Sequence, residues 1–227
     1  EFNAANESFD AAGKSRRIGQ LRELSRKFAK IKPVDKKRLS DQQLADLFNE
    51  ASTANQMTLY YLYYHHMRRR PASANPEDYA PLAGAVLDKL NYTKYSGKNP
   101  FVLKHTEAGY SLDLSRAPYS VFSLNIIGVY RRQVLSPLKL SVLDISNTKV
   151  ENLSEFDGLQ LDELRISGVP IENRSKNYLM SHVTRFKLKR IVLDEDDYPP
   201  QAITELRKKI EVIDSKKSAS KKNTESK

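Results

Sequence analysis

One pattern constrains the fold of this chain more than any other: two neighbouring stretches carry the same apolar residues at the same positions. The shared pattern is L-x-x-L-x-I-S-x-x-x-V/I, and one constant offset relates its two copies, at Leu140, Leu143, Ile145 and Val150 and at Leu161, Leu164, Ile166 and Ile171. A period of about 20 residues is typical of solenoids, in which each repeat supplies one short strand and buries its apolar residues against its neighbours. The pattern therefore predicts stacked, parallel strands.

Weaker copies flank this pair, before it at Val121, Leu124 and Ile126, and after it at Leu188, Ile191 and Leu193. The alternating run YSLDLS from Tyr110 predicts a further strand, which would form a hairpin with VFSLNI from Val121 and cover one end of the array. A helix from Pro199 to Ile213 would cover the other end. The alternative is an ordinary α/β fold in which two strands are similar by accident.

In the first third of the chain, the apolar residues have the spacing that is typical of helices. Apolar residues fall three or four apart between Ile18 and Ile31, and Pro33 ends that helix. Ser40 with Gln43 three positions later fits a capping box, and Asn75 before Pro76 predicts the start of a further helix. We expect an α/β chain in which this helical region caps a short solenoid with a parallel sheet.

Four segments follow from these patterns. Residues 1–13 form a flexible leader, residues 14–97 the helical region, residues 100–213 the repeat domain with its capping helix, and residues 214–227 a disordered basic tail with almost no apolar content. The chain begins at Glu1 rather than methionine, from which we expect a fragment or a processed protein.

The segment LSVLDISNTKVENLSEFDGLQLDELRISGVPIEN, which starts at Leu140, resembles the short leucine-rich repeats of bacterial proteins, whose consensus runs roughly LxxLDLSGTxVSDLSPLKGL. The resemblance covers about residues 110 to 213. It implies a right-handed solenoid within a larger bacterial protein, such as the Ser/Thr kinases of planctomycete-like bacteria. Thr148 fits this bacterial type, whereas Val169 and Asp196 depart from it, so no asparagine ladder is expected.

In repeats of this type, the variable residues between the core leucines point to the concave face of the sheet. That face would bind a protein partner through shape and charge, without chemistry, and the array being purely structural is an equal alternative. The predicted partner-binding residues are Asn125, Val142, Asp144, Ser146, Glu163, Arg165, Ser167, Arg190 and Asp194.

A second possibility is a basic module that binds nucleic acid through its N-terminal helices. Basic residues are dense from Lys14 to Arg38, and the stretch LYYLYYHHMRRR from Leu59 adds tyrosines that can stack on bases. The helical spacing of Leu59, Leu62 and Met67 favours a packed helix for that stretch. The contact residues of this alternative are Arg16, Arg17, Arg26, Lys27, Arg68, Arg69 and Arg70.

Enzymatic functions have little support. The chain has no cysteine, which excludes disulfides and thiol chemistry, and it lacks the common catalytic and phosphate-binding motifs. His65 and His66 are adjacent, so they diverge by about 100° on a helix and do not share a metal-binding face. We therefore expect no catalytic residue, cofactor or metal. No apolar run is long enough to span a membrane, and the compartment stays open.

Overall fold

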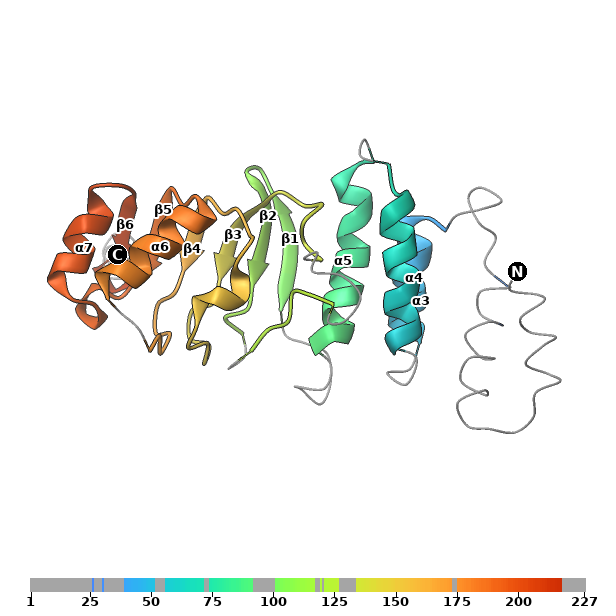
Figure 1. Cartoon of the computed structure of the whole chain (residues 1–227), viewed down its shortest axis with the longest axis horizontal. Coiled ribbons are helices and arrows are strands. Elements are labelled where there is room, and N and C mark those ends of the chain that lie inside the picture. Colours follow the sequence, from blue (N-terminus) through green and yellow to red (C-terminus); the bar gives the residue numbers. More distant parts are fainter. Residues whose placement is uncertain are drawn as a thin grey trace, which may run out of the picture. The chain divides into compact units, whose positions relative to one another are not determined.

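The computed structural model describes residues 26, 30, 39–51, 56–71, 74–91, 101–116, 119, 121–126, 134–172 and 175–217. The chain divides into two compact units. The helical unit comprises Glu1–Ser96 with Asn125–Val134, and the sheet unit comprises Gly97–Leu124 with Leu135–Lys227. The described elements are helices and a six-stranded, mostly parallel, open sheet (Figure 1). The prediction of an α/β fold with a parallel sheet is confirmed.

The helical unit contains α3 (Asp41–Glu50), α4 (Gln56–Arg69) and α5 (Pro76–Asn91). Both predicted start signals are confirmed. Ser40 and Gln43 form the capping box, and the Asn75 side chain accepts a hydrogen bond from the Glu77 N–H at 3.0 Å. The three helices pack together through fully buried apolar side chains: Leu44, Phe48, Leu59, Leu82 and Val86. The spacing of these residues in the sequence places them on one face of each helix.

The aromatic stretch on α4 is divided between core and surface. Tyr60 and Tyr63 are buried and face the Phe48 ring at centroid distances of 6.3 and 6.4 Å, whereas Tyr61 is 57% exposed. Tyr63 and Tyr79 share a hydrogen bond of 2.5 Å, and the Tyr79 hydroxyl donates to the carbonyl oxygen of Val134. Burial raises the pKa of Tyr63 to about 12, so this hydroxyl stays neutral and able to donate.

The sheet has six strands, each next to its neighbour in sequence: β1 (Val102–Thr106), β2 (Gly109–Asp113), β3 (Leu140–Asp144), β4 (Glu163–Arg165), β5 (Arg190–Leu193) and β6 (Glu211–Asp214). β1 and β2 form an antiparallel hairpin, and every later pair is parallel. The chain returns between parallel strands through η3 (Leu153–Phe156), α6 (Lys176–Phe186), and η4 (Glu195–Asp197) with α7 (Pro200–Arg207).

A row of leucine and isoleucine side chains crosses the sheet at equivalent positions of the strands, and we call it the leucine row. Leu112, Leu143, Leu164 and Ile191 are successive Cα partners, and each is at most 1% exposed. At about 25 cal/mol for each Å² of apolar surface removed from water, such a row is a main source of the stability of the sheet unit. The two copies recognised in the sequence thus occupy equivalent places in adjacent strands.

The turns that follow β3 and β4 are equivalent as well. Asn147 and Gly168 occupy the same position in the two copies, and both have a left-handed backbone, with φ of 59° and 68°. A Cβ atom at Gly168 would lie 2.8 Å from the Asn147 side-chain oxygen, so only glycine fits there without a shift. The backbone bond from Thr148 N to Ile145 O recurs from Val169 N to Ile166 O.

Three sequence predictions need correction. Residues 121–126 form no strand beyond an isolated bridge at Asn125, and the hairpin partner of β2 is β1 instead. The helix predicted to reach Ile213 ends at Arg207, because residues 211–214 pair with the edge of β5 as β6. The tail therefore does not start at residue 214: Asp214 ends β6, and residues 215–217 form a helical turn.

Several other predictions fall outside the described residues. These are the leader at 1–13, most of the helix between Ile18 and Ile31, and the tail from residue 218 onward. Arg26 and Lys30 are described, and both are helical. The segment 125–134, predicted within the repeat domain, groups with the helical unit. Within the described part of the chain, no helix has the length and apolar character to cross a bilayer.

Candidate functional site

The side of the sheet opposite the leucine row carries polar and charged side chains, and we call it the open face. Two rows of Cα partners cross it from β1 to β6. The first consists of Lys104, Ser111, Val142, Glu163, Arg190 and Glu211, and the second of Val102, Asp113, Asp144, Arg165, Val192 and Ile213. Most of these residues are partly or fully exposed, in contrast to the leucine row.

Ion pairs of alternating sign link four strands on the open face, and we call this set the charge ladder. It consists of Asp144, Glu163, Arg165, Arg190 and Glu211. Glu163 is at its centre: its Oε1 lies 2.5 Å from Arg165 Nε, and its Oε2 lies 3.0 Å from Arg190 Nη1. Arg190 Nε also donates to Glu211 at 2.7 Å, and these two carboxylates raise the pKa of Arg190.

The charge ladder holds its own side chains in place. The Glu163 side chain is 11% exposed, and both of its oxygens are paired, whereas the Arg165 and Arg190 side chains are nearly half exposed. Carboxylates that hold a guanidinium at two points restrict its rotamers, which reduces the entropy lost when a partner binds. The open face is therefore a preorganised surface with exposed guanidinium groups beside Val142 and Val192.

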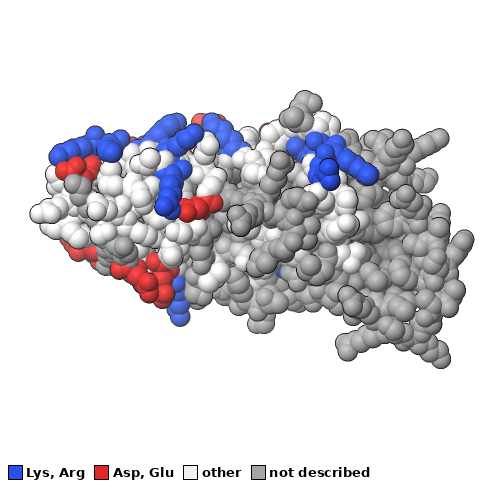
Figure 2. Space-filling view, viewed as in Figure 1, with Lys and Arg blue, Asp and Glu red and all other residues white. Residues whose placement is uncertain are grey.

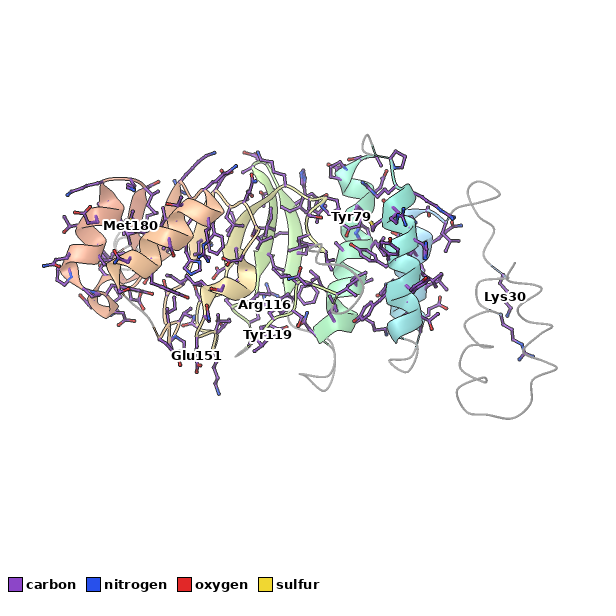
Figure 3. The ribbon with its side chains drawn as sticks, in the orientation of Figure 1. Lys30, Tyr79, Arg116, Tyr119, Glu151 and Met180 are labelled. Carbon is purple, nitrogen blue, oxygen red and sulfur yellow. The ribbon has the colours of Figure 1, made fainter. Side chains whose placement is uncertain are left out.

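A third row of small polar residues follows the ends of the strands. The Asp144 side chain accepts a hydrogen bond from the Ser146 N–H at 3.0 Å, and Asp194 accepts from the Gly168 N–H at 3.1 Å and from the Ser215 hydroxyl. The Ser167 hydroxyl is buried and has no hydrogen-bond partner among the described residues. Beyond these turns, Arg116 and Tyr119 follow β2, and Glu151 follows β3 (Figure 3).

The structure gathers five of the predicted partner-binding residues on this one face, Val142, Asp144, Glu163, Arg165 and Arg190, and places Ser146, Ser167 and Asp194 just after the strands. Asn125 is not among them, because its segment is not part of the sheet; its Oδ1 is buried and has no hydrogen-bond partner among the described residues. Sequence reasoning missed Glu211. The signal was present, since Glu211 follows Arg190 at the same interval that separates Leu140 from Leu161.

The structure describes four of the seven residues of the nucleic-acid alternative. Arg68 and Arg69 are exposed at the end of α4, and Arg26 is exposed. Arg70 is buried against Asp41, so its charge is already neutralised. Arg16, Arg17 and Lys27 lie outside the described residues.

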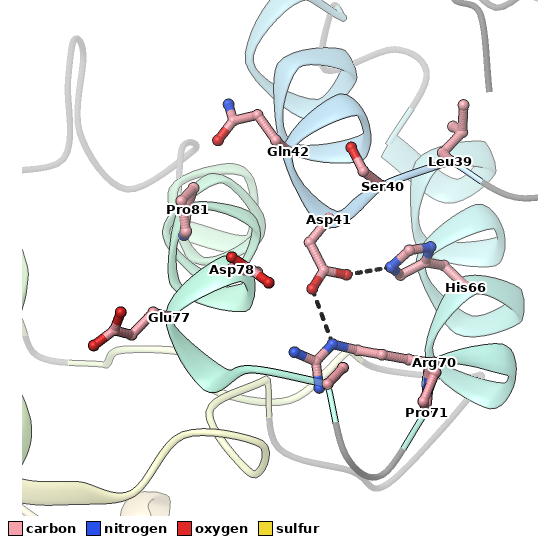
Figure 4. Close-up of a pocket in the computed structure, with 11 residues that line it drawn as sticks. Leu39, Ser40, Asp41, Gln42, His66, Arg70, Pro71, Glu77, Asp78 and Pro81 are labelled. Carbon is pink, nitrogen blue, oxygen red and sulfur yellow. Dashed lines mark hydrogen bonds and ion pairs between the residues drawn. The ribbon is translucent and has the colours of Figure 1, made fainter. Parts of the chain in front are cut away.

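Arg70 belongs to a buried cluster beside a pocket of about 380 Å³ in the helical unit (Figure 4). Asp41 Oδ1 lies 2.5 Å from His66 Nε2, and Asp41 Oδ2 accepts from Arg70 Nε at 2.9 Å. The side chains of Asp41, His66 and Arg70 are 9%, 7% and 8% exposed. Arg70 also donates to the Asn75 carbonyl at 2.7 Å. The cluster therefore links the start of α3, the end of α4 and the turn before α5.

Opposing effects act on the Asp41 carboxyl. Burial would raise its pKa, but hydrogen bonds from His66 and Arg70 and their charges outweigh it, so the pKa is lowered. Each oxygen of this carboxylate has a basic partner, so its negative charge is compensated within the cluster. We interpret the cluster as a structural clamp, with Glu77 and Asp78 on the rim of the pocket. His66 belongs to this clamp, and the ring of His65 packs on Tyr61 at 4.7 Å.

His182 on α6 is a second buried ionisable group. Its side chain is 3% exposed, its ring packs between Tyr178 and Phe186, and its Nδ1 lies 3.7 Å from Asp157 Oδ1, too far for a hydrogen bond. Asp157 is instead bonded to Arg185 at 2.8 Å. Burial lowers the pKa of His182, Asp157 opposes that effect and Arg185 adds to it.

This arrangement predicts acid sensitivity of the sheet unit. Because the pKa of His182 is lower in the folded state than its usual 6.5, the unfolded chain binds the proton first as the pH falls. The free energy of unfolding should thus decrease from about pH 7 to about pH 5, and this decrease should be smaller in His182→Phe. Urea unfolding at both pH values measures it, and an identical decrease in both proteins would contradict the assignment.

Comparison with known protein families, with curated proteins and with solved structures finds no significant match to this chain.

Proposed function

We propose that this chain is a non-catalytic protein-interaction module of the leucine-rich-repeat type, which binds a protein partner through the open face. The observation that carries the proposal is the charge ladder: the variable residues of successive strands meet on one face and hold each other in fixed positions. A preorganised surface of mixed charge is suited to recognising a protein by complementarity.

The repeat assignment has separate support. The leucine-type residues of four successive strands are in register, and the turns after β3 and β4 share their backbone geometry at equivalent positions of the two copies. The resemblance to bacterial leucine-rich repeats, which are often parts of larger proteins, adds the expectation that the partner or an attached domain performs the chemistry.

The proposal predicts that a charge placed at the centre of the open face weakens binding of the partner. Val142→Lys and Val192→Lys each introduce a long cation beside the Arg side chains without touching the leucine row. We expect at least a tenfold loss of partner capture, equivalent to about 1.4 kcal/mol. The measurement is quantitative affinity capture of prey protein from the source cells, with each retained protein identified by mass spectrometry.

Val121→Lys is the matched control, because Val121 is a 44% exposed valine of the sheet unit that lies outside the sheet. A specific partner should be retained by this variant at the level of the unmodified chain. Equal capture of every protein by the unmodified chain and both face variants would refute binding through the open face.

A further inference from the structure

Five exposed lysines gather at one edge of the sheet unit, and we call this set the basic edge. Its members are Lys139, Lys187, Lys189, Lys208 and Lys209, which directly precede the parallel strands β3, β5 and β6. The amino ends of parallel strands meet at a single edge, so these residues lie at that edge of the sheet. Lys and Arg side chains follow the upper margin of this unit in Figure 2, and Asp and Glu gather at its lower margin.

The strand register relates three of these lysines. Val142, Glu163, Arg190 and Glu211 are successive partners, and Lys139, Gln160, Lys187 and Lys208 each lie three places before one of them in sequence. Neighbouring strands are about 4.8 Å apart, so the starts of the four strands span about 14 Å. Three of these four positions carry a lysine, so the basic edge can neutralise about three phosphates of one strand.

Ion pairs neutralise only part of this charge. Lys189 Nζ lies 2.7 Å from Asp162 Oδ1, and Lys208 Nζ lies 2.9 Å from Glu205 Oε1. Lys139, Lys187 and Lys209 make no ion pair with any described residue. The opposite edge carries Asp144, Asp194, Glu195, Asp196 and Asp214 at or after the carboxyl ends of the strands, and Arg165, Lys216 and Lys217 pair with four of them. A polyanion would therefore be attracted to the basic edge rather than to the opposite one.

An exposed aromatic ring lies at the end of the basic edge. His105 on β1 packs on Tyr110 at a centroid distance of 4.9 Å, and Tyr110 donates its N–H to the Lys139 carbonyl at 2.8 Å. The His105 side chain is exposed, whereas Tyr110 beneath it is buried. A supported ring beside these cations suits an unpaired base next to its phosphates, whereas the carboxylates of an acidic peptide have no ring to stack on it.

We propose that the basic edge binds single-stranded nucleic acid without sequence preference, with phosphates on Lys139, Lys187 and Lys209 and a base against His105. This site is separate from the open face and from the arginines of α4. Its lysines are flexible point charges, so the binding is electrostatic and weakens steeply with salt.

The test is fluorescence anisotropy of a labelled single-stranded RNA of about twelve nucleotides, titrated with the whole chain at about 50 and 200 mM salt. With about three phosphates neutralised, the slope of log K against log salt should be near −2.1, a loss of roughly 20-fold between the two salts. Lys139→Glu/Lys209→Glu should weaken binding at least tenfold at the lower salt and reduce the slope by about 1.4. His105→Ala should weaken binding several-fold with no change in slope, because stacking releases no counterions.

Two control variants have the same change in charge. Arg116→Glu/Lys149→Glu alters the exposed opposite edge, and Arg68→Glu/Arg69→Glu alters the exposed end of α4. Both should bind within about twofold of the unmodified chain, apart from the long-range effect of net charge, which the higher salt screens. The open-face variant Val192→Lys should retain RNA binding, which separates this site from the proposed protein-binding face.

Three results would overturn the proposal. The first is the absence of RNA binding at the lower salt. The second is an equal loss in the basic-edge variant and in either charge-matched control, which would indicate diffuse attraction to a chain of net charge +10. The third is tighter binding of an oligoglutamate peptide of equal charge, which would assign the edge to acidic proteins.

Discussion

Asp41→Ala is expected to lower the free energy of unfolding of the helical unit by about 3 to 5 kcal/mol, because it leaves two buried basic groups without their partner. The His66 and Arg70 side chains are only 7% and 8% exposed, and both depend on the same carboxylate. Urea unfolding followed by circular dichroism at about 222 nm measures the loss, since this signal reports mainly on helices.

Asp46→Ala is the matched control, because Asp46 lies on the same helix, is exposed, and bonds only to Gln42 in the described structure. It should cost less than about 0.5 kcal/mol. Because hydrogen bonding lowers the pKa of Asp41, its contribution should be present above the usual pKa near 3.8 and disappear as the pH falls below that value. Equal losses in the two variants at neutral pH would refute the clamp.

Leu143→Ala is expected to cost the sheet unit about 2 to 5 kcal/mol, through lost transfer energy and the cavity left between rigid neighbours. Leu143 is completely buried and lies between its register partners Leu112 and Leu164. The adjacent Val142 points to the opposite side of the strand, so Val142→Ala should cost less than about 1 kcal/mol. Thermal or urea unfolding of both variants measures the difference.

This pair of variants tests the register of the sheet directly. A shift of one residue would exchange the two faces, and Val142→Ala would then be the more damaging change. A cost below about 1 kcal/mol for Leu143→Ala would contradict the leucine row, and with it the main support for the repeat.

The open face was largely predictable because its residues alternate with the apolar positions of the repeat. Once the two copies are aligned so that Leu143 matches Leu164, the side of the strand that faces away from them follows from the alternation of a β-strand. The charge ladder was not predictable in this way. Which guanidinium meets which carboxylate depends on the distances between strands and on the rotamers of long side chains.

Local signals were sufficient to predict the capping box at Ser40, the start of α5 after Asn75, and the two repeats with their buried leucines. Each of these features depends on neighbours within a few residues or on a short repeated period. The local sequence therefore contains all the information that these features require.

Contacts between residues that are distant in sequence were decided only by the tertiary structure. β6 forms because the edge of β5 offers unpaired backbone groups to residues that, alone, have helical spacing. The Arg70 side chain is buried, unlike those of Arg68 and Arg69, because it donates a hydrogen bond to Asp41, which lies far earlier in the sequence. The basic edge exists because parallel strands bring their amino ends together, and this aligns lysines that are scattered along the chain.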